Sequence, residues 1–119
     1  KKILKKNYYN LVRLKNNVDK FIYLLKKNKD IKSIGNLFDN SWKLKIKLSD
    51  NVSNTKINKL YDNLLNNGCC GGKLLGAGNG GFIFMIIDNK NKKKILNKFK
   101  SYKIFQPKID YHGSVILKK

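Results

Sequence analysis

The 119-residue sequence has no glutamate, one arginine, one proline and one histidine. Its seven acidic residues are all aspartates and are scattered, so no paired-carboxylate site is indicated. His112 precedes Gly113 in a predicted turn, where an exposed side chain is expected instead of a catalytic base. Cys69 and Cys70 are adjacent, a spacing that disfavours a disulfide and supplies no zinc ligand set. We therefore expect no catalytic residue and no metal ligand in this chain.

Long hydrophobic runs are also lacking. The longest wholly apolar stretch, residues 82–87, is far shorter than the roughly 20 residues that a membrane helix needs. No secretory signal pattern opens the chain. These features predict a cytoplasmic protein with no membrane partner. A hydrophobic content of 41% and this length predict one domain over residues 1–119 with its own core.

The net charge of +20 raises the question of a nucleic-acid partner or an anionic surface. All but one of the 27 basic residues are lysines. Proteins that bind nucleic acids favour arginine, whose planar side chain can form two hydrogen bonds at once. Lysine and asparagine are frequent along the whole sequence, a composition that is typical of a genome with biased base composition. We therefore expect no nucleic-acid partner. The alternative hypothesis is that the chain is a basic module that binds nucleic acid or an anionic surface.

The spacing of apolar residues predicts three helices in the first half of the chain. Apolar residues recur every three or four positions over residues 4–25, 31–48 and 57–65. Asp30 is expected to cap the second helix, and Ser53 or Asn54 the third.

The pattern changes to strands after Gly68, which is expected to end the third helix. Residues 71–77 and 82–87 predict two strands joined by a glycine turn, the second of them central and covered on both faces. Asp88 and Asn89 are expected to cap a fourth helix, and residues 102–105 and 114–117 predict two further strands. The predicted fold class is α+β: N-terminal helices followed by a four-stranded, mostly antiparallel sheet in the order β-β-α-β-β.

Residues 76–81, Gly-Ala-Gly-Asn-Gly-Gly, satisfy the pattern GxGxxG. A dinucleotide-binding loop would require a helix directly after the glycines, and a strand is predicted there. A P-loop would require Gly-Lys-Ser/Thr, which does not occur, and the partner motifs of a protein-kinase glycine loop are also missing. A hairpin without a ligand remains possible from the pattern alone. So much glycine is expensive in conformational entropy, which favours a loop that a ligand approaches closely.

The residues around this loop resemble a known family. Residues 71–82, Gly-Gly-Lys-Leu-Leu-Gly-Ala-Gly-Asn-Gly-Gly-Phe, look like the third conserved motif of the GHMP small-molecule kinases. Further segments are similar to the D-glycero-D-manno-heptose 7-phosphate kinase branch of that family: residues 42–49 and 52–54, Ile57, Leu60, Tyr61, Gly68, Asp110 and residues 113–116. Asn79 stands where the family usually has glycine, and asparagine tolerates a left-handed backbone better than other side chains do.

The resemblance implies the C-terminal, ferredoxin-like domain of an ATP-dependent sugar kinase. The N-terminal kinase domain, which this chain lacks, would be its partner and would carry the phosphate loop and the magnesium-binding residues. ATP and Mg²⁺ would be cofactors of the complete enzyme, which would phosphorylate the anomeric hydroxyl of a heptose 7-phosphate. The chain alone is expected to be inactive and to bind no cofactor tightly. Another GHMP kinase, such as a fucose kinase, is the nearest alternative.

The same resemblance supplies the candidate site residues. The third motif lines the cleft near the site of phosphoryl transfer, which implies cofactor binding by Gly76, Ala77, Gly78, Asn79, Gly80 and Gly81. Lys73, the nearest cation to the loop in sequence, and Lys45, which matches the family pattern, are the candidate substrate-binding residues; the alternative for Lys73 is a side chain that points to solvent. Trp42 is expected to be a core anchor. An exposed apolar face is expected around the glycine loop and along one side of the first helix, where the second domain would dock.

Overall fold

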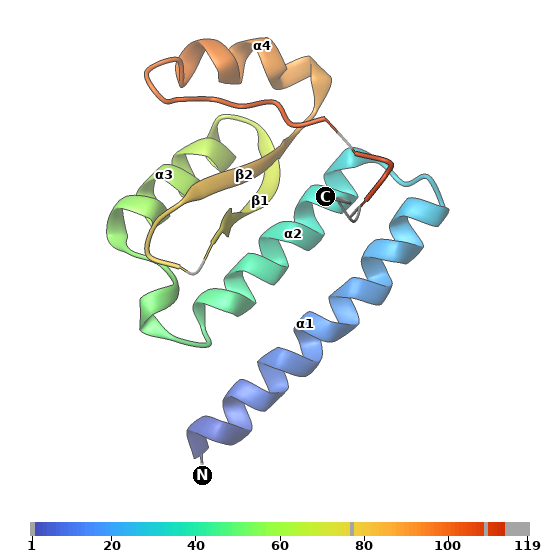
Figure 1. Cartoon of the computed structure of the whole chain (residues 1–119), viewed down its shortest axis with the longest axis vertical. Coiled ribbons are helices and arrows are strands. Elements are labelled where there is room, and N and C mark those ends of the chain that lie inside the picture. The colour runs from blue at the N-terminus through green and yellow to red at the C-terminus, as the bar shows by residue number, and fades with distance from the viewer. Residues whose placement is uncertain (1, 77, 109, 114–119) are drawn as a thin grey trace, which may run out of the picture.

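The chain forms helices followed by a β-hairpin and a last helix (Figure 1). The computed structural model describes residues 2–76, 78–108 and 110–113. Over these residues the elements are α1 (Lys2–Lys26), α2 (Ile31–Ile46), the 3-10 turn η1 (Asp50–Val52), α3 (Thr55–Asn66), β1 (Cys69–Leu75), β2 (Phe82–Ile87) and α4 (Asn89–Lys98). The α+β class is confirmed.

Short polar side chains begin the helices, as the sequence predicts. Asp30 accepts a hydrogen bond from the backbone N–H of Ser33 at the start of α2, and the Asp88 side chain accepts from the backbone of Lys90 at the start of α4. Of the two candidates for the α3 cap, Asn54 is the residue that caps it. Gly68 follows α3 with φ +109°, a left-handed conformation that favours glycine.

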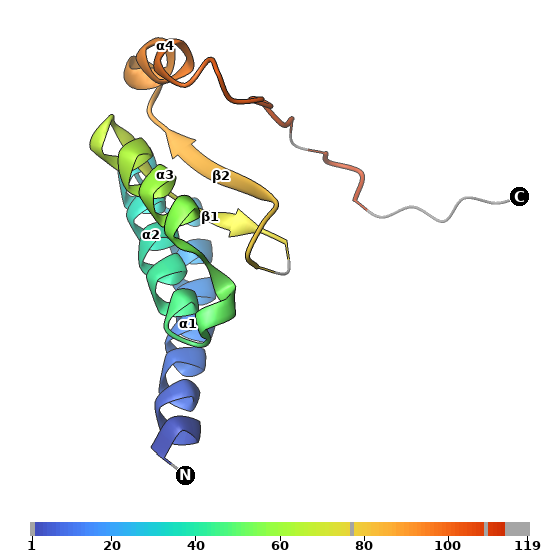
Figure 2. The ribbon, with the colours of Figure 1, turned by 90° about the vertical axis from the view of Figure 1, so that its left-hand side faces the viewer.

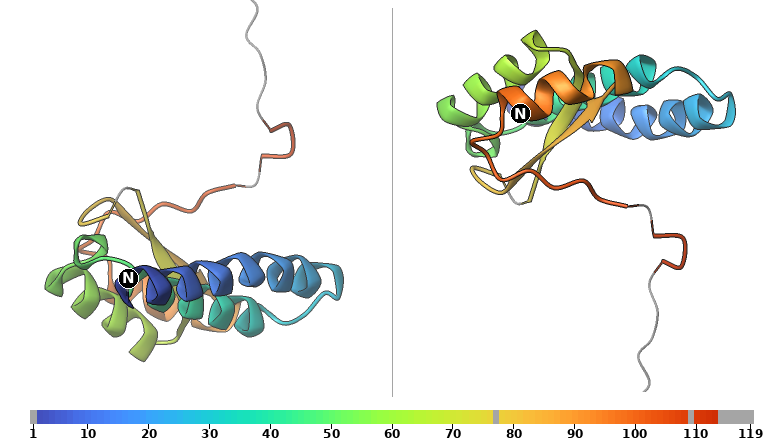
Figure 3. Two further views of the ribbon diagram at one scale, coloured as in Figure 1. Left: turned by 90° about the horizontal axis from the view of Figure 1, so that it is seen from below. Right: turned by 90° about the horizontal axis from the view of Figure 1, so that it is seen from above.

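The helices α1, α2 and α3 lie together, with α1 and α2 antiparallel, and the β1–β2 hairpin projects from them to one side (Figures 2 and 3). β1 and β2 pair antiparallel, from Leu75 opposite Phe82 to Cys69 opposite Ile87, with an irregularity between Cys69 and Gly71. The helix α4 follows β2 at the end of the hairpin away from the glycine loop.

Two small buried clusters hold these elements together. One consists of Trp42, Tyr61 and Leu74, from α2, α3 and β1. The other joins Cys69 to Ile95 and Phe99 under α4. Trp42 is only 1% exposed, which confirms the expectation that it is a core anchor.

The predicted four-stranded sheet is wrong for the residues that the structure describes, where β1 and β2 form a two-stranded sheet. Residues 102–105 form no ladder, and Tyr102, Ile104 and Phe105 stay exposed, so no buried face fixes the register of a strand there. Their one aromatic contact with the hairpin in the described structure joins Phe105 to Phe82, with ring centroids 5.6 Å apart. The strand predicted at 114–117 lies outside the described residues. β2 pairs with β1 alone in the described sheet, so it is not a central strand, and its first residue, Phe82, is 61% exposed.

The closest approach between α2 and β1 is made by glycines. A Cβ at Gly35 would collide with the side chain and backbone of Cys70. A Cβ at Gly71 would collide with the carbonyl oxygen of Gly35, and Gly71 also has φ +149°. The backbones of helix and strand therefore touch directly at this point.

We expect Gly35→Ala to lower the free energy of unfolding by about 1–3 kcal/mol, because the methyl group overpacks a contact between backbones. Urea denaturation followed by circular dichroism measures the change. The matched control is Gly80→Ala, since a Cβ at Gly80 meets no atom within 4 Å and should leave stability nearly unchanged. Equal stability of the two variants would contradict the prediction.

Candidate functional site

The glycine loop forms the tip of the hairpin, between β1 and β2. Its backbone is left-handed at several positions, with φ of +118° at Gly76, +111° at Gly78, +56° at Asn79 and +117° at Gly81. A side chain at Gly81 would also collide with the carbonyl oxygen of Leu75. The loop therefore needs glycine for its shape, and asparagine occupies a left-handed position as the sequence predicts. Ala77 lies outside the described residues.

The loop rests on the segment that leads into α3. The Asn79 backbone N–H donates to the Val52 carbonyl oxygen at 3.3 Å, and a Cβ at Gly78 would lie 2.9 Å from the carbonyl oxygen of Asn51. The Asn54 side chain, through Nδ2, donates to the Asn79 Oδ1 at 2.8 Å and to its backbone oxygen at 3.3 Å. We call the bond between the two side chains the Asn54–Asn79 clasp.

Sequence reasoning identified Asn54 as a helix cap and as part of the segment 52–54 that resembles the family, but not as a partner of the loop. Its Oδ1 does accept from the backbone N–H of Ile57 at 3.0 Å, so both ends of the side-chain amide are engaged. The one signal in the sequence was the asparagine at position 79, where the motif usually has glycine. Nothing in the spacing of two residues 25 positions apart indicates that they meet.

The other side of the loop is open. A Cβ at Gly80 would meet no atom within 4 Å, and both Gly80 and Gly81 are exposed. Among the described residues, no acceptor bonds to the backbone N–H of Gly80, whereas that of Asn79 is taken by Val52. Bare amides in a turn can bind an anion. The open side of the loop at Gly80 can therefore admit a phosphate, whereas the Asn79 amide is already engaged.

The two candidate lysines do not lie at the loop tip. Lys73 lies opposite Phe84 in the hairpin, and its Nζ is 5.9 Å from the ring centroid of Phe38 on α2, at cation–π distance. Lys45 is half-buried in the last turn of α2, two helical turns beyond Phe38 and so on the same side of that helix. Among the described residues no hydrogen bond or ion pair joins either lysine to the loop.

A buried tyrosine holds the strand that leads to the loop. The Tyr61 hydroxyl accepts from the Gly72 N–H at 3.1 Å, and it lies within donating distance of the Gly72 carbonyl oxygen at 3.1 Å and Asp39 Oδ1 at 3.0 Å. The Asp39 carboxylate is also paired with Lys43 at 2.6 Å. Burial, and then the Asp39 carboxylate, raise the pKa of Tyr61 above its ordinary value. The sequence did not indicate this network.

The remaining candidates for chemistry are weak. His112 is exposed beside Asp110, in a turn as expected. Cys69 is a buried free thiol, and burial raises its pKa to about 11, so it is not a thiolate near neutral pH. Within residues 2–76, 78–108 and 110–113, no group of three histidine, cysteine or aspartate side chains could hold a metal ion. None of the helices in that part of the chain is long and apolar enough to span a membrane.

The expected apolar face is exposed. On α1 the exposed apolar side chains include those of Leu11, Val18, Ile22 and Leu25, and on the hairpin those of Leu75 and Phe82. Between them Phe38 packs against Phe21 of α1 and Phe84 of β2, with ring centroids 5.5 and 5.8 Å apart. We call these exposed apolar residues of α1 and of the hairpin the apolar angle.

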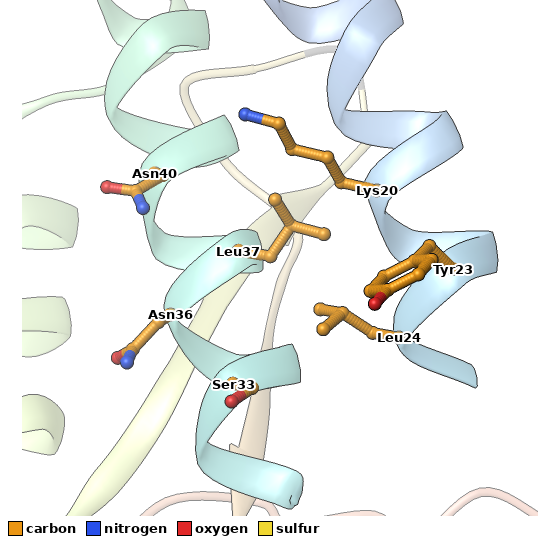
Figure 4. A pocket seen from close by; sticks show the side chains of 7 residues that line it. All are labelled: Lys20, Tyr23, Leu24, Ser33, Asn36, Leu37 and Asn40. Carbon is orange, nitrogen blue, oxygen red and sulfur yellow. The ribbon is translucent and has the colours of Figure 1, made fainter. Parts of the chain in front are cut away.

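An open pocket of about 390 Å³ lies elsewhere, between α1 and α2 (Figure 4). It is lined by Lys20, Tyr23 and Leu24 of α1 and by Ser33, Asn36, Leu37 and Asn40 of α2. It contains none of the predicted site residues and no pair of an acid and a nucleophile. The glycine loop therefore remains the candidate site.

Most of the chain resembles a known protein family. The family model described as GHMP kinases C terminal matches residues 21–104, which is most of the chain. A D-glycero-alpha-D-manno-heptose 7-phosphate kinase of Campylobacter jejuni is 33% identical over 67 residues, which are 56% of this chain and 20% of that protein. The matched segment thus spans about a fifth of the length of this relative.

We expect Tyr61→Phe to lower the free energy of unfolding by about 1–3 kcal/mol, because it leaves buried backbone groups of Gly72 without a partner. Urea denaturation at pH 7 measures the loss. Tyr111→Phe is the control, since Tyr111 is 87% exposed and its hydroxyl should contribute nothing measurable. A loss of the same size in both variants would contradict the assigned role.

The raised pKa of Tyr61 predicts how stability depends on pH. Above its ordinary pKa of 10.0 the unfolded chain loses a proton that the folded chain keeps. The contribution of Tyr61 is therefore complete below about pH 10 and declines as the pH rises through the folded-state pKa. Urea midpoints from about pH 9 to 11 should fall more steeply for the native sequence than for Tyr61→Phe. Parallel curves would refute this.

Proposed function

The chain belongs to the family of GHMP kinase C-terminal domains, and we propose that it is the C-terminal domain of an ATP-dependent sugar kinase of the cytoplasm. The sugar we propose is a heptose 7-phosphate, phosphorylated at its anomeric hydroxyl. The relative from Campylobacter jejuni is a heptose 7-phosphate kinase, which supports this choice. The observation that carries the proposal is the glycine loop, with its exposed Gly80 amide and no atom over the position of a Cβ.

The proposed reaction suits a loop without reactive side chains. The anomeric oxygen would form a bond to the γ-phosphorus of ATP while the bond from that phosphorus to the bridging oxygen of ADP breaks, and the hydroxyl proton would leave to a base or to water. Phosphoryl transfer depends mainly on positioning and on stabilising charge on the transferred group. A preorganised N–H group at Gly80 would provide such stabilisation. Lys73 and Lys45 would line the approach of the sugar phosphate from the hairpin face.

The chain fits only part of what the cofactors require. Mg²⁺ prefers oxygen ligands such as carboxylates, and no aspartate lies in residues 76–81. The bound ion would neutralise charge on the phosphates, and its ligands would come from the N-terminal domain. We propose that this domain covers the apolar angle, because exposed apolar patches mark interaction surfaces.

We expect the whole protein that carries this chain to transfer phosphate from ATP to a heptose 7-phosphate in the presence of Mg²⁺. Gly80→Ala should lower kcat/KM by about tenfold or more, because its methyl group stands where the phosphate approaches. Its denaturation midpoint should stay unchanged. Lys93→Ala, at an exposed position on α4, is the control.

A panel of sugars in the same coupled assay tests the choice of substrate. A preference for fucose over heptose 7-phosphate would move the chain to the alternative branch of the family. No transfer to any sugar, together with tight and salt-sensitive binding to duplex DNA near physiological ionic strength, would replace the proposal by the basic-module alternative.

A further inference from the structure

We infer that Asn54 is a positioning residue for the glycine loop, acting through Asn79. Resting on the proposed function, the inference is that the clasp holds the Asn79 side chain away from the open side of the loop. The Gly80 amide then stays accessible to a phosphate. Asn54 itself touches no reacting group in this account.

The clasp is needed because position 79 carries a side chain. Asn79 is left-handed, with φ +56°, and is the residue directly before Gly80. It is exposed, so a rotation about its side-chain bonds is not blocked by packing. A free amide group there could swing over Gly80 and put its carbonyl oxygen beside an incoming anion. A glycine at this position has no such group to control.

Asn54 is well placed to prevent that rotation. Its Oδ1 is fixed by the backbone N–H of Ile57 at 3.0 Å, which leaves Nδ2 directed at Asn79. The donor therefore has one orientation, set by the helix cap, and the 2.8 Å bond to Asn79 Oδ1 follows from it. The start of α3 and the shape of the loop are thus coupled through one side chain.

The backbone of the loop has supports besides Asn54, whose Nδ2 also donates to the Asn79 backbone oxygen at 3.3 Å. The bond from the Asn79 N–H to Val52 and the close contact of Gly78 with Asn51 involve no side-chain atom of Asn54 or Asn79. Loss of the clasp should therefore free the Asn79 side chain without unfolding the loop. Asn54→Ser keeps a capping oxygen and removes the amide donor, so it separates the two roles of Asn54.

The test is a double-mutant cycle in the whole protein, with KM for ATP and kcat as readouts. We expect Asn54→Ser to raise KM about three- to tenfold and to change kcat less than twofold, as a net loss of one hydrogen bond allows. Asn79→Gly should leave KM within about twofold, because the group that needs control is gone. The double variant should match Asn79→Gly, which a purely structural role of Asn54 would not produce.

Asn67→Ser is the matched control, because Asn67 forms a similar amide pair with Asn63 at the far end of α3. It should leave KM unchanged. An unchanged KM in Asn54→Ser, or a double variant as impaired as Asn54→Ser, would overturn the inference.

A second measurement does not depend on the kinase reaction. Inorganic triphosphate is titrated into the isotopically labelled 119-residue chain while the amide resonance of Gly80 is followed. The clasp predicts about three- to tenfold weaker binding in Asn54→Ser and recovery in the double variant. A shift that is identical in all variants, or no shift at all, overturns the clasp. Absence of phosphate transfer by the whole protein, with this titration behaving as expected, would overturn only the proposed function.

Discussion

The direct contact between the backbones of α2 and β1 is the constraint on which the hairpin depends. Gly35 and Gly71 allow helix and strand to touch, and the Tyr61 hydroxyl closes the free edge of the strand at the next residue, Gly72. Because these contacts are short and buried, they leave the strand little freedom to shift. The glycine loop begins four residues after Gly72. Its position relative to the helices is therefore fixed by the packing of β1 against them, and not by contacts within the loop.

The loop combines a rigid support with an open face. Gly78 and Asn79 contact Asn51 and Val52 of η1, whereas a Cβ at Gly80 would meet no atom within 4 Å. Because one side of the loop is already held in place, the loop loses little conformational entropy when an anion binds to its other side. This is the advantage of a preorganised site. The asparagine in the glycine run is compatible with this arrangement because a cap residue of the neighbouring helix binds its side chain.

Local features of the fold could be predicted from the sequence, and contacts between distant residues could not. The caps at Asp30, Asn54 and Asp88 follow from short-range chemistry, and the hairpin follows from β-favouring residues around glycines. Residues 102–105 have the same β-favouring composition, but a strand also needs a partner and a buried face, which no local pattern encodes. The Tyr61–Asp39 and Asn54–Asn79 bonds join residues 22 and 25 positions apart, and polar residues at such distances carry no periodic signal.

The distribution of charge over the loop decides what this chain can contribute to catalysis. Residues 76–81 offer backbone N–H groups and one amide side chain, with no carboxylate, and the nearest cation in sequence, Lys73, lies over Phe38 instead of at the tip. Such a loop offers N–H groups suited to negative charge, but it has no side chain that accepts a proton strongly and no carboxylate of the kind that Mg²⁺ prefers. In the proposed enzyme those groups must stand on the other domain, facing the open side of Gly80. Leu75 and Phe82 of the apolar angle flank the loop in sequence, so a domain seated on them would also reach the loop. Docking of the N-terminal domain would then also complete the phosphate-binding site.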